Sequence, residues 1–196
     1  MTSTASERAP RQDNRREHLL DAAAGLICRR GYHATSMRDI ARAAAMLPGS
    51  IYYHFASKEE LLVAVYAEGV LRIAERVDDA VAQATDPMKR LEEACVAHLE
   101  MLLADSDYAQ VVVRVLPEDV PSVSARLTAL RDDYEERFRR LIAALAPPRT
   151  RRRYLRLTLL GALNGAQTWY RPGGDPPARI ARRVLECLRE PLSGES

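Results

Sequence analysis

Residues 35–62 read TSMRDIARAAAMLPGSIYYHFASKEELL, and this stretch decides the fold. Its first part predicts a short amphipathic helix, because Met37, Ile40 and Ala41 recur at helical spacing. A second short helix is expected over Pro48–His54, since proline suits the first turn of a helix. Two short helices with a tight connection form a helix-turn-helix, whose second helix can enter a DNA major groove.

The predicted second helix has polar-tipped rings on its outer face. Ile51 and Phe55 lie four residues apart and face the core. The consecutive rings of Tyr52, Tyr53 and His54 cannot all face one core, so their donors suit phosphate oxygens and base edges. An aromatic triplet taken alone more often packs between helices, and it is the surrounding stretch that favours DNA contact.

Upstream of this stretch, the sequence predicts one more helix. We expect a disordered arm over residues 1–13 and a helix from Asn14, where Asn14 and Glu17 have the spacing of a capping box. Gly31 supplies the left-handed residue that ends this helix.

Downstream, Ser57 caps a long helix to about residue 82, and Asp86 with Pro87 starts another. Further helices are expected at about residues 108–116, 122–146, 150–170 and from residue 176. No segment alternates long enough to be a strand. The predicted fold class is all-α, with about nine helices.

Composition excludes several classes of protein. The three cysteines of the 196-residue chain, Cys28, Cys95 and Cys187, are far apart, which fits a reducing compartment. No apolar run could span a membrane, and the opening residues lack the apolar core of a secretory signal, so we expect a cytoplasmic protein. The four histidines have no paired metal spacing, so neither a metal nor another cofactor is expected.

Positive charge is concentrated at the amino end, where residues 1–57 hold eight arginines against five acidic residues. The remainder of the chain is close to neutral, since the net charge is +2. A basic head on a neutral body permits phosphate binding.

The stretch resembles the DNA-binding domain of the TetR family over roughly residues 15–68, most specifically in the string GSIYYHFASKEEL. The resemblance implies a helix-turn-helix domain at residues 14–57, with its motif at about 36–55. It further implies a ligand-binding and dimerisation domain at residues 58–196. Such a protein is a homodimeric transcriptional regulator, most often a repressor, that binds a roughly palindromic operator and is released by a small molecule.

The resemblance also assigns DNA contacts position by position. Residues of the first short helix would contact the DNA backbone, and the start of the second helix would face the groove. The residues that follow in the chain would contact phosphates and, in part, bases. The residues concerned are Thr35, Ser36, Arg38, Pro48, Gly49, Ser50, Tyr52, Tyr53, His54 and Lys58.

Two positions depart from the family pattern. Ala45 stands where the family usually has the glycine of the turn, and Leu47 where it often has Ser or Thr. Alanine in a left-handed conformation costs about 1 kcal/mol, so a reshaped turn is expected.

A second, shorter resemblance lies in LGALNGAQTWYRPGG, residues 160–174, which is similar to a TetR subgroup that responds to acyl-CoA thioesters. The same residues also suit a purely structural role, with Trp169 and Tyr170 in the dimer bundle and Pro-Gly-Gly ending a helix. The two roles can coexist.

The body helices carry enough apolar surface to line a ligand cavity. Asn164 and Gln167 lie on one helix face and either bond across the dimer or point at a polar ligand group. The candidate ligand-binding residues are His98, Met101, Leu102, Tyr134, Phe138, Asn164, Gln167, Tyr170 and Arg171. For a long-chain acyl-CoA, the phosphates would meet Arg114, Arg171 or the run Arg151–Arg153, which otherwise reads as a solvated first turn.

Two other classes compete with a regulator. A helical protein-interaction adaptor would use the carboxy-terminal half, and a small helical enzyme would use Cys28 or His98. Nothing supplies a base and an orienting partner at readable spacing, so we expect no enzyme and no catalytic residues.

Overall fold

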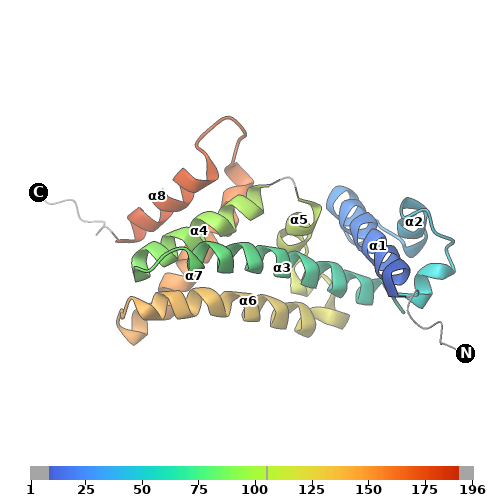
Figure 1. Ribbon diagram of the computed structural model, residues 1–196, viewed down its shortest axis with the longest axis horizontal. Coiled ribbons are helices and arrows are strands. Elements are labelled where there is room, and N and C mark those ends of the chain that lie inside the picture. Colours follow the sequence, from blue (N-terminus) through green and yellow to red (C-terminus); the bar gives the residue numbers. More distant parts are fainter. Residues whose placement is uncertain (1–8, 105, 190–196) are drawn as a thin grey trace, which may run out of the picture.

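A computed structural model describes residues 9–104 and 106–189, with side chains described from residue 14 (Figure 1). These residues form eight α-helices and three short 3-10 turns, with no strand among them, which confirms the all-α class. The ninth expected helix is one of the turns: the segment predicted as a helix over Pro48–His54 is the 3-10 turn η1, Ser50–Tyr53. Within the described residues no helix combines the length and apolar character that crossing a membrane requires.

The amino-terminal head consists of α1 (Ala9–Arg30), α2 (Met37–Ala43) and η1. Helix α1 begins at Ala9 rather than Asn14, so the predicted arm is wrong for residues 9–13, and residues 1–8 lie outside the described part. The expected capping box at Asn14 therefore falls inside the helix. Gly31, with φ of 82°, ends α1 as predicted, and its amide donates to the Ile27 carbonyl at 2.8 Å.

The body follows in eight elements. Its long axis is α3, which begins at the head and runs along the body beside α4 and α6 (Figure 1). The predicted caps are present: the Ser57 hydroxyl accepts from the Glu60 amide, and Asp86 accepts from the Lys89 amide. The bounds are α3 Lys58–Ala82, α4 Pro87–Leu103, α5 Asp107–Arg114, η2 Pro117–Asp119, η3 Pro121–Val123, α6 Ser124–Ala144, α7 Arg149–Trp169 and α8 Pro177–Arg189.

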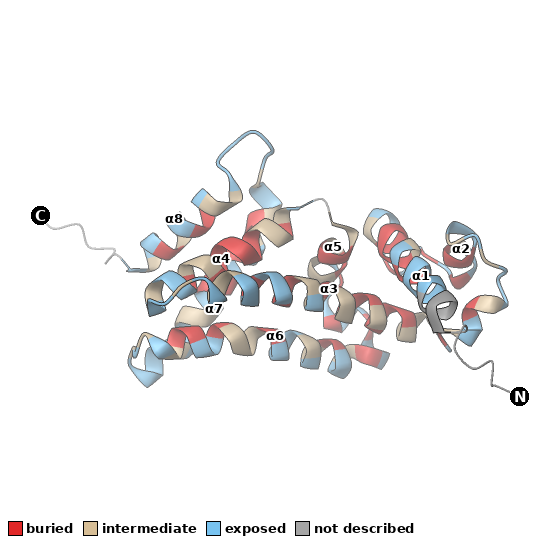
Figure 2. Cartoon of the chain, in the orientation of Figure 1, coloured by how far each residue is buried: buried red, intermediate tan, exposed pale blue. Residues whose placement is uncertain are grey.

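Buried residues lie on the facing sides of these helices (Figure 2). Their side chains form two cores. The first core joins the head to α5 and to the early part of α3, with Ile51, Tyr66 and Tyr108 as members. The second core fills the body and includes Phe138 and Leu163, which are fully buried. The boundary between the two cores thus crosses α3 and does not lie at its start.

Helix α5 sits against both the head and α3. The Tyr108 hydroxyl donates to the Asp21 carboxylate of α1 at 2.8 Å, and the Arg114 guanidinium donates to the Cys28 carbonyl at 3.3 Å. Gly69 lets α3 approach α5 closely, because a Cβ at this position would lie 2.8 Å from the Tyr108 carbonyl oxygen. The head is therefore fastened to the body through α5 as well as through α3.

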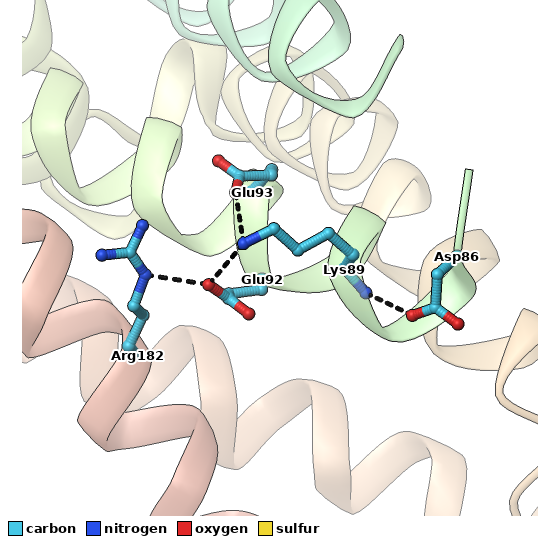
Figure 3. Close-up of polar contacts among 5 residues, drawn as sticks. All are labelled: Asp86, Lys89, Glu92, Glu93 and Arg182. Carbon is cyan, nitrogen blue, oxygen red and sulfur yellow. Dashed lines mark hydrogen bonds and ion pairs between the residues drawn. The ribbon is translucent and has the colours of Figure 1, made fainter. Parts of the chain in front are cut away.

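A charged cluster ties α8 to α4 (Figure 3). Arg182 on α8 donates to Glu92 at 2.8 Å, and Lys89 pairs with Glu92 and Glu93 at 2.9 Å each. These side chains are a quarter to a half exposed, so solvent screens each pair and its contribution to stability is small. The apolar packing of Ile180, Ala181 and Leu185 in the second core therefore contributes more to holding α8 than the charged cluster does.

Candidate nucleic-acid interface and ligand cavity

The turn of the helix-turn-helix is built on a left-handed alanine. Ala45 has φ of 53°. The amide of Met46 donates to the Ala41 carbonyl at 2.8 Å, and the amide of Ala45 donates to the Arg42 carbonyl at 3.1 Å. This pair of hydrogen bonds is a Schellman motif, in which the left-handed residue is usually glycine. The left-handed conformation expected at Ala45 is confirmed, but the turn keeps the ordinary Schellman geometry and is not reshaped as the sequence predicted.

Substituting this residue with glycine should stabilise the protein. Ala45→Gly relieves the left-handed strain but adds freedom to the unfolded chain, so the expected net gain in free energy of unfolding is about 0.5–1 kcal/mol. Chemical denaturation measures it. Ala146→Gly should raise the free energy of unfolding by a similar amount, because Ala146 also has a left-handed φ, of 51°, and lies outside the head. Ala44→Gly should not raise it, because Ala44 has φ of −84°. A loss of stability in Ala45→Gly would contradict the strain described here.

The outer face of η1 is open to solvent. Tyr53 is 91% exposed and Tyr52 is 57% exposed, while Ile51 and Phe55 are buried beneath them. Pro48 and Gly49 are also exposed, with Ser50 and His54 half-buried. Two large exposed rings on a four-residue turn cost hydrophobic free energy in the free protein, so they indicate a contact surface.

The amino end of α2 adds polar groups to this face. The Ser36 hydroxyl accepts from the Asp39 amide at 3.2 Å, and the Ser36 amide donates to the Asp39 carboxylate at 3.2 Å, a complete capping box. The Ser36 hydroxyl also donates to the Asp39 carboxylate at 2.5 Å, and this hydrogen bond, with that from the Ser36 amide, lowers the pKa of Asp39. Arg38 and Arg42 project from the exposed side of α2.

One predicted contact, Thr35, is buried, whereas another, Lys58, stays at the edge of the head. Thr35 is 2% exposed, and its hydroxyl donates to the Gly31 carbonyl at 2.9 Å. Its side chain therefore closes the end of α1 and is removed from the predicted backbone clamp. The Lys58 ammonium lies 4.1 Å from the Tyr32 ring centroid, and burial lowers its pKa. Lys58 lies at the edge of the head, and its ammonium group packs over the Tyr32 ring.

A partly open cavity of about 180 Å³ lies in the body between α3, α4, α5, α6 and α7. Most of its wall is apolar. Its polar wall residues come from α4, α6 and α7. The lining residues are Tyr66, Val70, Ile73, His98, Leu102, Val112, Val113, Leu116, Pro117, Arg131, Tyr134, Glu135, Leu160 and Asn164.

A hydrogen-bonded chain of three side chains forms part of the polar wall, and it is buried at His98 and Tyr134 and exposed at Asn164. His98 Nδ1 lies 2.5 Å from the Tyr134 hydroxyl, and His98 Nε2 lies 3.0 Å from Asn164 Oδ1. An amide oxygen only accepts, so Nε2 carries the proton and Nδ1 accepts from Tyr134. Burial lowers the pKa of His98 to about 4, which keeps the ring neutral. The edge of Phe138 packs on the same ring, with 5.6 Å between centroids.

Four of the nine predicted ligand residues line this cavity: His98, Leu102, Tyr134 and Asn164. The other five do not. Phe138 supports His98 from behind, Met101 packs on the second core, and Gln167 donates to the Leu102 carbonyl at 3.4 Å. Tyr170 and Arg171 line a separate, open recess beside α8.

Sequence patterns missed Arg131, Glu135 and most of the apolar wall. Helical periodicity assigns a residue to the inner face, but it does not tell a side chain that fills the core from one that borders a void. Arg114, a predicted phosphate contact, does not line the cavity and donates to the Cys28 carbonyl. Among the described residues, no cluster of His, Cys, Asp and Glu is arranged to hold a metal ion.

Comparisons with known proteins bear on both sites. A family model described as "Bacterial regulatory proteins, tetR family" matches residues 19–65, and one described as "Tetracyclin repressor-like, C-terminal domain" matches residues 84–192. The second covers more than half of the chain. The chain is also similar to the repressor KstR2 of Rhodococcus jostii, at 29% identity over 98% of each chain.

Other matches are partial or structural. KstR2 of Mycobacterium tuberculosis is 38% identical over 52% of this chain, a segment that spans half the length of that relative. The solved structure described as the ketosteroid transcriptional regulator KstR2 of Mycobacterium tuberculosis superposes with a TM-score of 0.68 at 26% identity. That superposition covers 95% of this chain and 96% of the other.

Proposed function

The chain belongs to the tetR family of bacterial regulatory proteins, and from this premise we propose that it is a ligand-responsive, sequence-specific repressor of transcription. The observation that carries the proposal is the exposed face of η1, where Tyr52 and Tyr53 project, together with the exposed arginines of α2, Arg38 and Arg42. A DNA-binding regulator works on the chromosome, so we place it in the cytoplasm. The relatives named above are regulators, which supports a role without catalysis.

The DNA-binding role is assigned to residues 14–57. Ser36, Arg38, Ser50 and the segment Tyr52–His54 are accessible in this head, with Lys58 at its edge. Hydroxyl, imidazole and guanidinium donors at this face suit phosphate oxygens and base edges. The Thr35 side chain is left out of the proposed contacts, because its hydroxyl is bonded inside the head.

Dimerisation is assigned to α7 and α8 within residues 58–196. Helix α7 exposes three large apolar side chains, Tyr154, Leu157 and Trp169, which are 68%, 46% and 53% exposed. Their spacing along one helix suits burial against a second copy of the chain. A twofold dimer then presents two heads, so the operator is roughly palindromic.

The effector is assigned to the 180 Å³ cavity, and we propose an acyl-CoA thioester with a compact acyl group. The segment ending in WYRPGG supports the thioester, by its similarity to an acyl-CoA-responsive subgroup. A cavity of about 150 Å³ holds a benzene ring, so this cavity suits one ring or a short branched chain. We therefore propose a short or single-ring acyl group in place of the long-chain acyl group expected from the sequence.

A gel-shift titration with the DNA flanking the gene tests the proposal. If Arg38, Arg42 and Lys58 of both subunits contact phosphates, six contacts predict a loss of about 10³ in affinity between 50 and 200 mM salt. The steep decline reflects the release of counterions from the DNA. An adaptor or a small enzyme would give no discrete shifted species above random DNA, and that result would overturn the proposal.

The alternative of an enzyme built on Cys28 receives no support from its surroundings. Burial raises the pKa of the Cys28 thiol, and it raises the pKa of Cys95 to about 12. A reactive cysteine needs a lowered pKa, so neither thiol is an activated nucleophile.

A further inference from the structure

A recess lined by arginines lies between the second half of α6 and the first half of α7, with a volume of about 490 Å³. It is distinct from the effector cavity. Six of its eight lining residues are arginines and only one is acidic. They are Glu136, Arg139, Arg140, Ala143, Arg149, Arg152, Arg153 and Arg156.

The acidic residues nearby do not neutralise this charge. Arg139 and Arg140 both pair with Glu136, and Arg156 pairs with Glu135. The Arg152 guanidinium donates to the Pro147 carbonyl at 3.0 Å, which leaves its charge in place. Within the described part of the chain, Arg149 and Arg153 form no ion pair.

Gathering these cations in one concave surface is unfavourable for the protein alone. Like charges repel, and a concave low-dielectric wall focuses their field. The fork of a guanidinium matches two oxygens of one phosphate, so several arginines around a recess suit adjoining phosphate groups. A recess of this volume has room for more than one phosphate.

Its position argues against the operator as the occupant. Figure 1 shows the end of α6 at the far end of the body from α1 and α2. The helix α6 has 21 residues and is about 30 Å long, and the recess adjoins its last turns. The phosphates of DNA bound at the head are out of reach.

We propose that this recess binds a small molecule with two adjoining phosphates, such as a nucleoside diphosphate moiety. The inference does not depend on the identity of the effector. The recess also shares a wall with the effector cavity, because Arg156 lines the first and its partner Glu135 lines the second. A diphosphate that engages Arg156 therefore competes with Glu135, and the two sites are coupled.

Calorimetric titration with ADP, pyrophosphate and adenosine at low ionic strength tests the site directly. The full-length protein should bind ADP and pyrophosphate but not adenosine. Arg149→Ala/Arg153→Ala should weaken ADP binding at least tenfold. The control Arg90→Ala/Arg179→Ala removes the same charge from α4 and α8, outside the recess, and should change affinity less than twofold.

Three results would overturn the site. The first is the absence of binding of ADP and pyrophosphate to the unaltered protein. The second is an equal loss in both double variants, which would show a general effect of net charge. The third is unchanged ADP binding together with a shifted dimer dissociation concentration, measured by sedimentation, which would assign Arg149 and Arg153 to contacts between subunits. Arg149→Gln/Arg153→Gln repeats the comparison if the alanine variant melts at a lower temperature.

Discussion

Tyr53→Ala should weaken operator binding thirtyfold or more without moving the thermal unfolding transition. The ring is 91% exposed, so its removal costs almost no packing in the free protein. One lost contact to DNA costs about 1–3 kcal/mol, and a homodimer carries the substitution twice, which predicts about 2–6 kcal/mol in total. Gel-shift titration measures the loss of affinity, and scanning calorimetry checks the fold.

Two control variants separate this contact from general effects. Tyr53→Phe keeps the ring and removes only the hydroxyl, so its loss of affinity should be smaller. Leu71→Ala removes a 49% exposed side chain from α3, outside the head, and should leave DNA affinity unchanged. Equal operator affinity in Tyr53→Ala and the unaltered protein would remove η1 from the proposed interface.

The free energy of unfolding should fall between pH 6.5 and pH 4 by up to about 3 kcal/mol through His98 alone. Burial lowers the pKa of this ring to about 4 in the folded chain, against 6.5 in the unfolded chain. The unfolded state therefore takes up a proton first as pH falls. The contribution of His98 is complete above pH 6.5 and is lost progressively down to about pH 4.

His98→Gln isolates this contribution from the carboxylates that titrate in the same range. Glutamine is neutral at all pH values and retains a donor and an acceptor for Tyr134 and Asn164. Urea denaturation at a series of pH values should show the stability of the variant declining less steeply than that of the unaltered protein. Parallel curves would mean that His98 does not titrate differently in the folded and unfolded states.

Local signals in the sequence were sufficient for most helix starts and for the turn. Ser36, Ser57 and Asp86 all cap the helices predicted to follow them, because a cap depends on only three or four neighbouring residues. The strained Ala45 was predictable for the same reason. The start of α1 was missed because residues 9–13 carry no apolar stripe. A helix can nevertheless extend beyond the segment that it buries.

The sites were less predictable because they depend on packing between distant segments. Exposure of Tyr52 and Tyr53 followed from the spacing of Ile51 and Phe55. The burial of Thr35 depends instead on how α1 ends against α2, which no periodicity encodes. The ion pair of Arg156 with Glu135, which lies between the cavity and the arginine-lined recess, depends likewise on how α6 and α7 pack.

The packing of α5 on both α1 and α3 limits how such proteins can be recombined. A chimera that exchanged only residues 14–57 with a relative would set a foreign α1 against the resident Tyr108 and Arg114, whose partners are Asp21 and the Cys28 carbonyl. It would also split one continuous apolar core between two parents. Transplanting DNA specificity onto this effector body therefore calls for grafting the exposed positions of α2 and η1 alone, or for moving α5 together with the head.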